Sequence, residues 1–140
     1  MKITIISNNI KNREPELGEE VEQRLTITSD GRVYLRRYGY TGHYRDHDSI
    51  DKEYYRLKDI DRDLMNAIFK KIINNYEVSF GEIIGIGTWK MEIIDDDYEV
   101  YTSYGVMEGY NFIGIDMTVL MSRLIGIDHL FLFGSKDIGG

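Results

Sequence analysis

Cysteine is absent from the 140-residue chain, and proline occurs only once. Without cysteine the protein can form no disulfide, use no thiolate nucleophile and hold no cysteine-ligated zinc. Long hydrophobic runs are also missing. The opening segment MKITIISNN is too short for the core of a signal peptide, and no later run approaches the roughly 20 apolar residues that span a bilayer. We therefore expect a cytoplasmic protein that does not enter a membrane.

Aromatic residues, in contrast, are plentiful, with 11 tyrosines, five phenylalanines and one tryptophan, and hydrophobic residues make up 42% of the chain. Disordered chains have too little apolar surface to bury, whereas this composition can form a packed core. Because single domains commonly contain about 100 to 150 residues, we expect residues 1–140 to fold as one globular domain.

Five segments have the composition or the period-two alternation of β-strands, and they span residues 2–7, 21–28, 33–38, 89–93 and 98–104. The Asp30-Gly31 pair predicts a tight turn between the second and third segments, because glycine adopts the positive φ that such turns require. Asp95 to Asp97 separates the last two segments in the same way. The pattern therefore predicts two hairpins preceded by an N-terminal strand.

Two helices complete the expected fold. Segment 39–50, GYTGHYRDHDSI, has turn-forming residues and no period, so we expect a mobile loop there. A central helix follows, with Asp59 or Asp61 as its cap and an apolar stripe of Leu64, Met65, Ile68, Phe69 and Ile72. Asp116 is expected to cap a short C-terminal helix that stops at Gly126, and the segment LFLF then forms a buried tail. We expect an α+β fold, in which a mainly antiparallel sheet packs against both helices.

Motifs for metal binding or catalysis are weak. His43, Asp46, His47 and Asp48 crowd into six residues, but in a loop their spacing is not specific for a metal ion, and no HExxH motif is present. The acids at 59, 61 and 63 start like a calcium loop, yet they lack its glycine and its bidentate glutamate. GIGTWK, at 85–90, starts like a dinucleotide-binding motif, but it leads into an expected strand rather than a helix. We therefore expect no nucleotide site there. We expect no catalytic residue, metal or cofactor, and a metal-binding loop at His43 and His47 remains an alternative.

The acidic residues gather in two clusters, and the net charge is −7 from 24 acids and 17 bases. Such clusters keep a protein soluble, and they can also bind a basic partner by presenting charge as nucleic-acid phosphates do. The overall charge opposes direct nucleic-acid binding, so the expected partner is a basic protein. Neither a membrane partner nor an oligomeric state is indicated. The first cluster is Glu14, Glu16, Glu19, Glu20 and Glu22, and the second is Asp95, Asp96, Asp97 and Glu99.

An opposite cluster of arginine and tyrosine occupies the segment 32–40. Alternation places Arg36 on one face of its strand with Tyr34 and Tyr38, whereas Arg37 falls on the apolar face. Arg37 must then be neutralised by a buried acid or lie beyond the edge of the core. Arginine beside tyrosine is typical of protein interfaces and of base-stacking surfaces. Because the surrounding sequence is acidic, we favour a protein contact.

Three segments carry a family resemblance: EEVEQRLTITSDGRVYLRRY, WKMEIIDDDYEVYTSYG and LMSRLIGIDHLFLF. Together they resemble a family of small uncharacterised proteins from low-GC Gram-positive bacteria and their mobile elements. That family implies the same order of hairpin, central helix, tryptophan-containing strand and terminal apolar segment. It implies no activity.

Small acidic proteins without cysteine from such elements look like anti-CRISPR inhibitors, an analogy of size, charge and source. The function expected from the sequence is therefore that of a non-enzymatic binding protein. It would inhibit a basic nucleic-acid-handling partner, most concretely an RNA-guided CRISPR effector nuclease. An immunity protein that neutralises a toxin is the alternative, beside the metal-binding loop.

Overall fold

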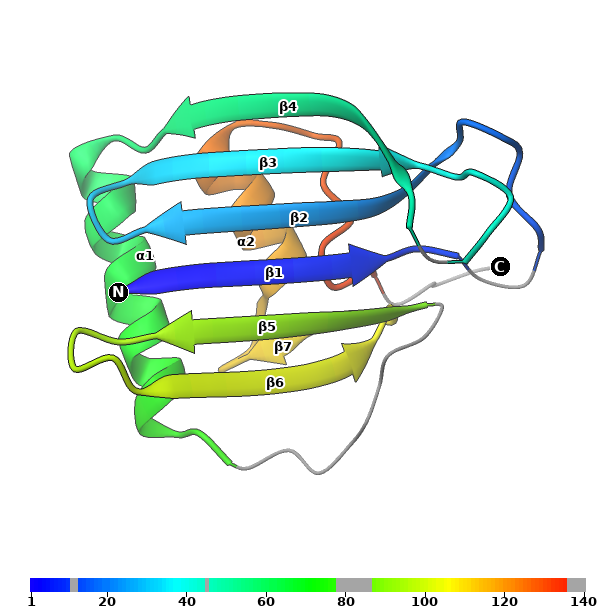
Figure 1. The fold of residues 1–140 in the computed structure, drawn as a ribbon. Helices are drawn as coiled ribbons and strands as arrows, with labels where there is room; N and C mark the ends of the chain where they lie inside the picture. Colours follow the sequence, from blue (N-terminus) through cyan, green and yellow to red (C-terminus); the bar gives the residue numbers. More distant parts are fainter. Residues whose placement is uncertain (11–12, 45, 78–86, 136–140) are drawn as a thin grey trace.

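The computed structural model describes residues 1–10, 13–44, 46–77 and 87–135. Six strands form one antiparallel sheet in the order β4-β3-β2-β1-β5-β6, and two short strands form a second sheet (Figure 1). The prediction of an α+β fold with a mainly antiparallel sheet is confirmed. The elements are β1 (Lys2–Asn8), β2 (Glu20–Thr28), β3 (Arg32–Gly39), β4 (Asp48–Arg56), α1 (Asp59–Asn74), β5 (Thr88–Ile94), β6 (Val100–Val106), β7 (Asn111–Phe112), β8 (Ile115–Asp116) and α2 (Met117–Ile125).

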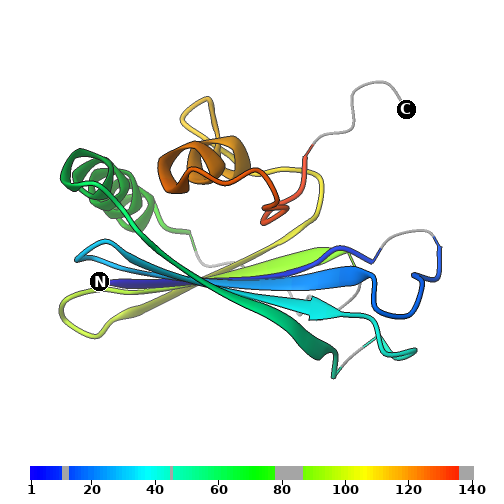
Figure 2. The ribbon, with the colours of Figure 1, turned by 90° about the horizontal axis from the view of Figure 1, so that it is seen from above.

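Both helices lie on the same side of the six-stranded sheet (Figure 2). Alternate residues of the strands point toward them, so Ile3, Leu25 and Leu35 are buried while their sequence neighbours face away. The core is completed by the buried side of α1 and by the segment after α2. The buried residues from these two parts are Met65, Ile68, Phe69, Ile72, Leu130, Leu132 and Phe133.

Several local predictions are confirmed. Gly31 turns the β2–β3 hairpin with a φ of 93°. The side chain of Asp116 accepts a hydrogen bond from the backbone N–H of Val119 at the start of α2, and Gly126 ends this helix in the left-handed conformation. The LFLF segment is largely buried, as expected.

Three predictions around residues 48–64 are wrong. Part of the expected loop, together with the residues after it, forms the edge strand β4. Its inward residues Asp51 and Glu53 are charged, so it lacks the apolar alternation that marks the other strands. The N-cap of α1 is Lys58 rather than an aspartate, and Leu64 is 46% exposed instead of part of the buried stripe.

Positions 78–86, which include the first two residues of GIGTWK, lie outside the described residues. Among the helices of the described ranges, none is long and apolar enough to cross a membrane.

The packing of Trp89 on Gly105 gives a direct test of this core. The two residues face each other on β5 and β6, and a β-carbon at position 105 would overlap the indole ring. Gly105→Ala should therefore lower the free energy of unfolding by about 2 kcal/mol through overpacking. Ser103→Ala, two residues earlier on the same strand face, serves as the control. Equal urea midpoints for the two variants would contradict this packing.

Candidate functional site

The side of the six-stranded sheet that faces away from α1 and α2 is not covered by any described helix (Figure 2). We call it the open face, formed by the outward side chains of β1 to β6. The strand register assigns it seven of the 17 basic residues but only two acids, Glu22 and Glu92. Its charge is therefore opposite to that of the whole chain. The basic residues are Lys2, Arg24, Arg32, Arg36, Lys52, Arg56 and Lys90.

Like charges stand directly opposite one another on neighbouring strands of this face. Arg36 pairs in register with Arg24 on β2 and with Lys52 on β4, and Arg32 pairs with Arg56. Neighbouring strands are about 4.8 Å apart, and like charges at that separation destabilise a sheet. Within the described chain, no carboxylate forms an ion pair with Arg36, Lys52 or Arg56. Arg24 is paired with Glu22 and Arg32 with Asp30, so Arg36, Lys52 and Arg56 are the unneutralised part of this cluster.

Tyrosine rings lie beside these cations. Tyr34 and Tyr54 pair in register, with ring centroids 5.3 Å apart and planes inclined by 54°. They are 42% and 54% exposed, respectively, which is high for side chains of this size. The guanidinium of Arg24 lies 5.0 Å from the centroid of the Tyr38 ring, a cation–π contact that also orients the arginine.

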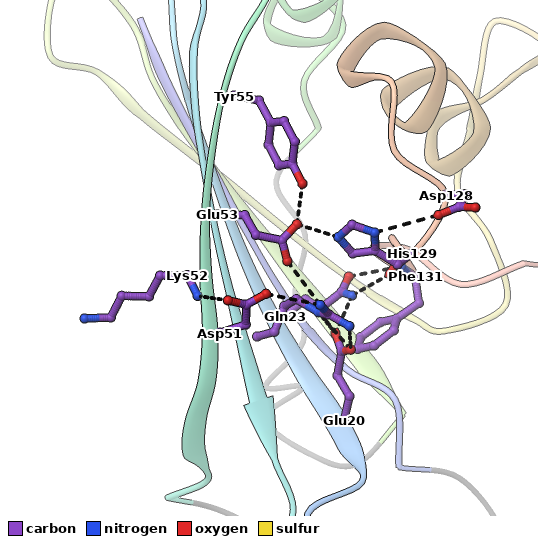
Figure 3. Close-up of polar contacts among 10 residues, drawn as sticks. Glu20, Gln23, Asp51, Lys52, Glu53, Tyr55, Asp128, His129 and Phe131 are labelled. Carbon is purple, nitrogen blue, oxygen red and sulfur yellow. Dashed lines mark hydrogen bonds and ion pairs between the residues drawn. The ribbon is translucent and has the colours of Figure 1, made fainter.

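A second polar region, the Arg37 cluster, lies on the helix-facing side of β3 and β4, at the edge of the core (Figure 3). Arg37 donates to Glu20 through Nε and Nη2, at 2.9 and 2.6 Å, and to Glu53 through Nη1 at 3.1 Å. Asp51 adds a longer ion pair at 3.3 Å. This arrangement confirms that a partly buried acid neutralises Arg37, and the two-pronged contact with Glu20 is the strong form of such a pair.

The Arg37 cluster also joins the sheet to the segment after α2. Nε2 of His129 lies 2.7 Å from Glu53, and the amide of Gln23 donates to both Glu20 and the backbone carbonyl of His129. Gln23 accepts in return from the N–H of Phe131. His129 is therefore a hydrogen-bonded residue at the edge of the core, as expected, and every polar group named here has a protein partner.

Hydrogen bonds control the ionisation of Glu53. Burial alone would raise its pKa, but hydrogen bonds with Tyr55, His129 and Arg37 outweigh burial and lower the pKa to about 2. The contact with the carboxylate of Glu53 raises the pKa of Tyr55 to about 12. Both shifts hold the groups in their ordinary charge states at neutral pH, which suits a structural cluster rather than proton transfer.

A shallow hollow lies beside the Arg37 cluster, between α2 and the segment that follows it. Ser122, Arg123, Asp128 and His129 are its main polar lining residues. The His129 ring is already bonded to Glu53, and the Asp128 carboxylate is 3.8 Å from the other ring nitrogen. The hollow thus brings together no nucleophile with a free base.

The first acidic cluster does not form a free anionic surface. Glu20 is bound to Arg37, Glu22 to Arg24 and His47, and Glu19 to Arg13. Glu14 accepts from the hydroxyl of Tyr40 at 3.2 Å. Among the five acids of this cluster, only the exposed Glu16 has a side chain without a partner in the described part of the chain.

The second acidic cluster lies at the opposite end of the sheet, because Lys2 pairs with Ile94 at one end of β1 and Asn8 pairs with Glu22 at the other. These six steps along β1 separate the clusters by about 20 Å. Asp95 organises its own turn, accepting from the N–H groups of Asp97 and Glu99, and Asp96 binds the N-terminal amine at 2.8 Å. The two clusters are not brought together in one surface.

The structure gives His47 a packing role. Its buried ring places Nδ1 3.2 Å from Glu22 and Nε2 3.0 Å from the backbone carbonyl of His43. The rings of His43 and His47 therefore do not share a ligand position. In the described ranges no three His, Asp or Glu side chains converge as a metal site would require.

Of the predicted arginine–tyrosine cluster, Tyr34, Arg36 and Tyr38 do share one face, as alternation indicated. Their neighbours Lys52, Tyr54 and Arg56 were not expected on this face, because strand β4 was not predicted. The alternation of Lys52, Tyr54 and Arg56 with Glu53 and Tyr55 was the available signal.

No protein-family model, no curated protein and no solved structure matches this chain. The family resemblance therefore stays a prediction, and the function has to be argued from the geometry of the open face and the Arg37 cluster.

The Arg37 cluster predicts an acid-sensitive contribution to stability. Because the pKa of Glu53 falls from 4.5 to about 2 on folding, its contribution is complete above pH 4.5 and is lost as the pH falls toward 2. Glu53→Gln should remove this part of the pH dependence, at most about 3 kcal/mol, in unfolding curves measured across that range. Glu16→Gln, at an exposed position, should leave the slope unchanged. If the free energy of unfolding of Glu53→Gln depends on pH as steeply as that of the wild type, Glu53 is not the source of this contribution.

Proposed function

We propose that this is a non-enzymatic binding protein that holds an anionic partner against the open face of its sheet. The observation that carries the proposal is the row Arg24, Arg36 and Lys52, three cations in direct register on adjacent strands. Such a row lowers the stability of the sheet, and binding of negative charge would relieve its repulsion. The exposed Tyr34 and Tyr54 beside it are suited to contact rather than to solubility.

The net charge of −7 does not oppose such an interaction at close range. Charges are screened beyond about 8 Å at physiological ionic strength, so a partner in contact with the open face interacts mainly with its local positive charge. The acidic ends of the sheet instead restrict where a polyanion can lie. They favour a partner placed across the strands rather than beyond their ends.

The polar groups of the Arg37 cluster support a non-enzymatic function. Glu53 and His129 are bonded to each other, and the pKa of Glu53 is lowered, away from the range that general acid–base catalysis uses. His129 lines the adjoining hollow, but its Nε2 is already bonded to Glu53.

Inhibition of a basic partner such as an RNA-guided nuclease is a second candidate, and the net charge together with the exposed Glu16, Asp97 and Glu99 favours it. A toxin-neutralising immunity protein has the same support. Both would require the acidic clusters. Replacing Glu16, Asp97 and Glu99 with glutamine should then weaken capture of the basic partner, and unchanged capture would remove these acids from the mechanism.

The proposal predicts that binding to a polyanion depends on the free cations of the open face. The variant Arg36→Gln, Lys52→Gln, Arg56→Gln should elute from a heparin column at clearly lower salt than the wild type. Its urea midpoint should be unchanged or higher, because the substitutions relieve like-charge repulsion between strands.

A matched control removes the same number of charges from the helix side, with Lys58, Lys70 and Lys71, all exposed, changed to glutamine. This control should elute like the wild type. If both variants lose retention equally, net charge rather than the open face determines binding, and the proposal fails.

A further inference from the structure

We infer that the anionic partner of the open face is single-stranded nucleic acid, with bases stacked on Tyr34 and Tyr54 and phosphates bound by Arg36 and Lys52. This inference rests on the proposed function and names its ligand class. Two features of the open face support it, namely the exposed rings and the placement of the cations one step along the strands from them.

The exposed tyrosines distinguish a single strand from other polyanions. Base faces are hidden in a duplex, whereas an unpaired strand can stack its bases on aromatic side chains. Tyr34 and Tyr54 offer two adjacent rings whose planes differ by 54°, so the rings cannot stack flat on each other and each keeps a face for a base. A polyanion without bases would leave these rings unused.

The cations lie at the spacing that a nucleotide chain needs. On β3, Arg36 lies between Tyr34 and Tyr38, and successive outward side chains of a strand are about 7 Å apart. Lys52 pairs in register with Arg36 and precedes Tyr54 by the same interval on β4. Each ring therefore has a positive charge one step away, as a base has its own phosphate.

Short polar side chains form the surface beside the tyrosine pair. In register, Tyr34 is followed by Thr26 on β2 and Thr4 on β1, and both threonines are half-buried. Small hydroxyl side chains let a sugar–base unit approach the sheet and can donate or accept hydrogen bonds. Beyond Thr4 the row meets Glu92 on β5, which limits the anionic strand to β1 through β4.

Because the rest of the molecule is acidic, we expect only moderate affinity for the nucleic-acid strand. Neutralisation of a few phosphates by Arg36, Lys52 and their basic neighbours releases few counterions, so binding should be moderate and should weaken as salt rises. Salt should affect the phosphate contribution more than the stacking contribution.

The test is fluorescence anisotropy with labelled oligonucleotides of about 12 nucleotides, within the site sizes of single-strand binders. Four probes are compared at one salt concentration: a mixed-sequence DNA strand, the RNA strand of the same sequence, an abasic strand of equal length, and a DNA duplex. The wild type should bind at least one of the two base-containing single strands about tenfold or more tightly than the abasic strand and the duplex. A preference between the DNA strand and the RNA strand identifies which nucleic acid is the ligand.

The variant Tyr34→Leu, Tyr54→Leu keeps apolar bulk on the strands and removes the rings. It should bind the base-containing strand as weakly as the abasic one, whereas Tyr44→Leu, an exposed tyrosine outside the strands, should bind like the wild type. Circular dichroism confirms folding, and Tyr54→Leu alone provides a second variant on the edge strand, with a smaller loss. Equal affinity for abasic and base-containing strands, or tighter binding of the duplex, would overturn the inference.

Failure of the inference and failure of the proposed function give different results. If retention on heparin depends on Arg36, Lys52 and Arg56 but no single strand is preferred, the open face binds another polyanion and only the ligand class is wrong. Competition by poly-glutamate that matches competition by the oligonucleotide would identify an acidic protein instead. If the heparin result also fails, the open face is not the binding surface.

Discussion

One-sided coverage of the six-stranded sheet is the constraint on which the rest of the structure depends. Both helices and the segment after α2 pack on the same side, so the strands at the centre of the sheet must be apolar on one face and compatible with water on the other. The inner face meets this requirement with Ile, Leu, Val and Met. The outer face meets it with cations, threonines and tyrosines, and this is why a chain of negative net charge presents a basic surface.

At its β4 edge the core is closed by ionic and hydrogen-bonded contacts rather than by apolar residues. Arg37 occupies an inward position next to Leu35, and it is tolerated there because Glu20 and Glu53 surround its guanidinium. The same acids bind Gln23 and His129, which fastens the C-terminal segment over the sheet. Removing Arg37 would leave the partly buried carboxylates of Glu20 and Glu53 without their shared cation. Every ionised member of the cluster thus has its partners within the protein.

Alternation and capping residues were sufficient to predict most of the fold. The five predicted strands, the Asp30-Gly31 turn and the Asp116 cap follow from local chemistry, and the structure confirms them. Strand β4 could not be recognised in this way, because its inner face contributes to the Arg37 cluster rather than to an apolar core. The open face was harder still to predict. Arg24, Arg36 and Lys52 become neighbours only through pairing in register, and whole-chain charge concealed their local excess. The acidic run suggested one anionic surface, whereas Glu19, Glu20 and Glu22 are each paired with a different arginine.

The central claim is that the open face is where this protein meets its partner. It is tested most directly by two-dimensional ¹H–¹⁵N NMR during titration with a mixed-sequence single strand. The account predicts that shifted amide signals cluster on the outward residues of β2, β3 and β4, around Tyr34, Arg36 and Tyr54, with little change on α1. Shifts confined to the loop of Glu14 to Glu19, to the turn of Asp95 to Glu99, or to the hollow beside His129 would contradict it.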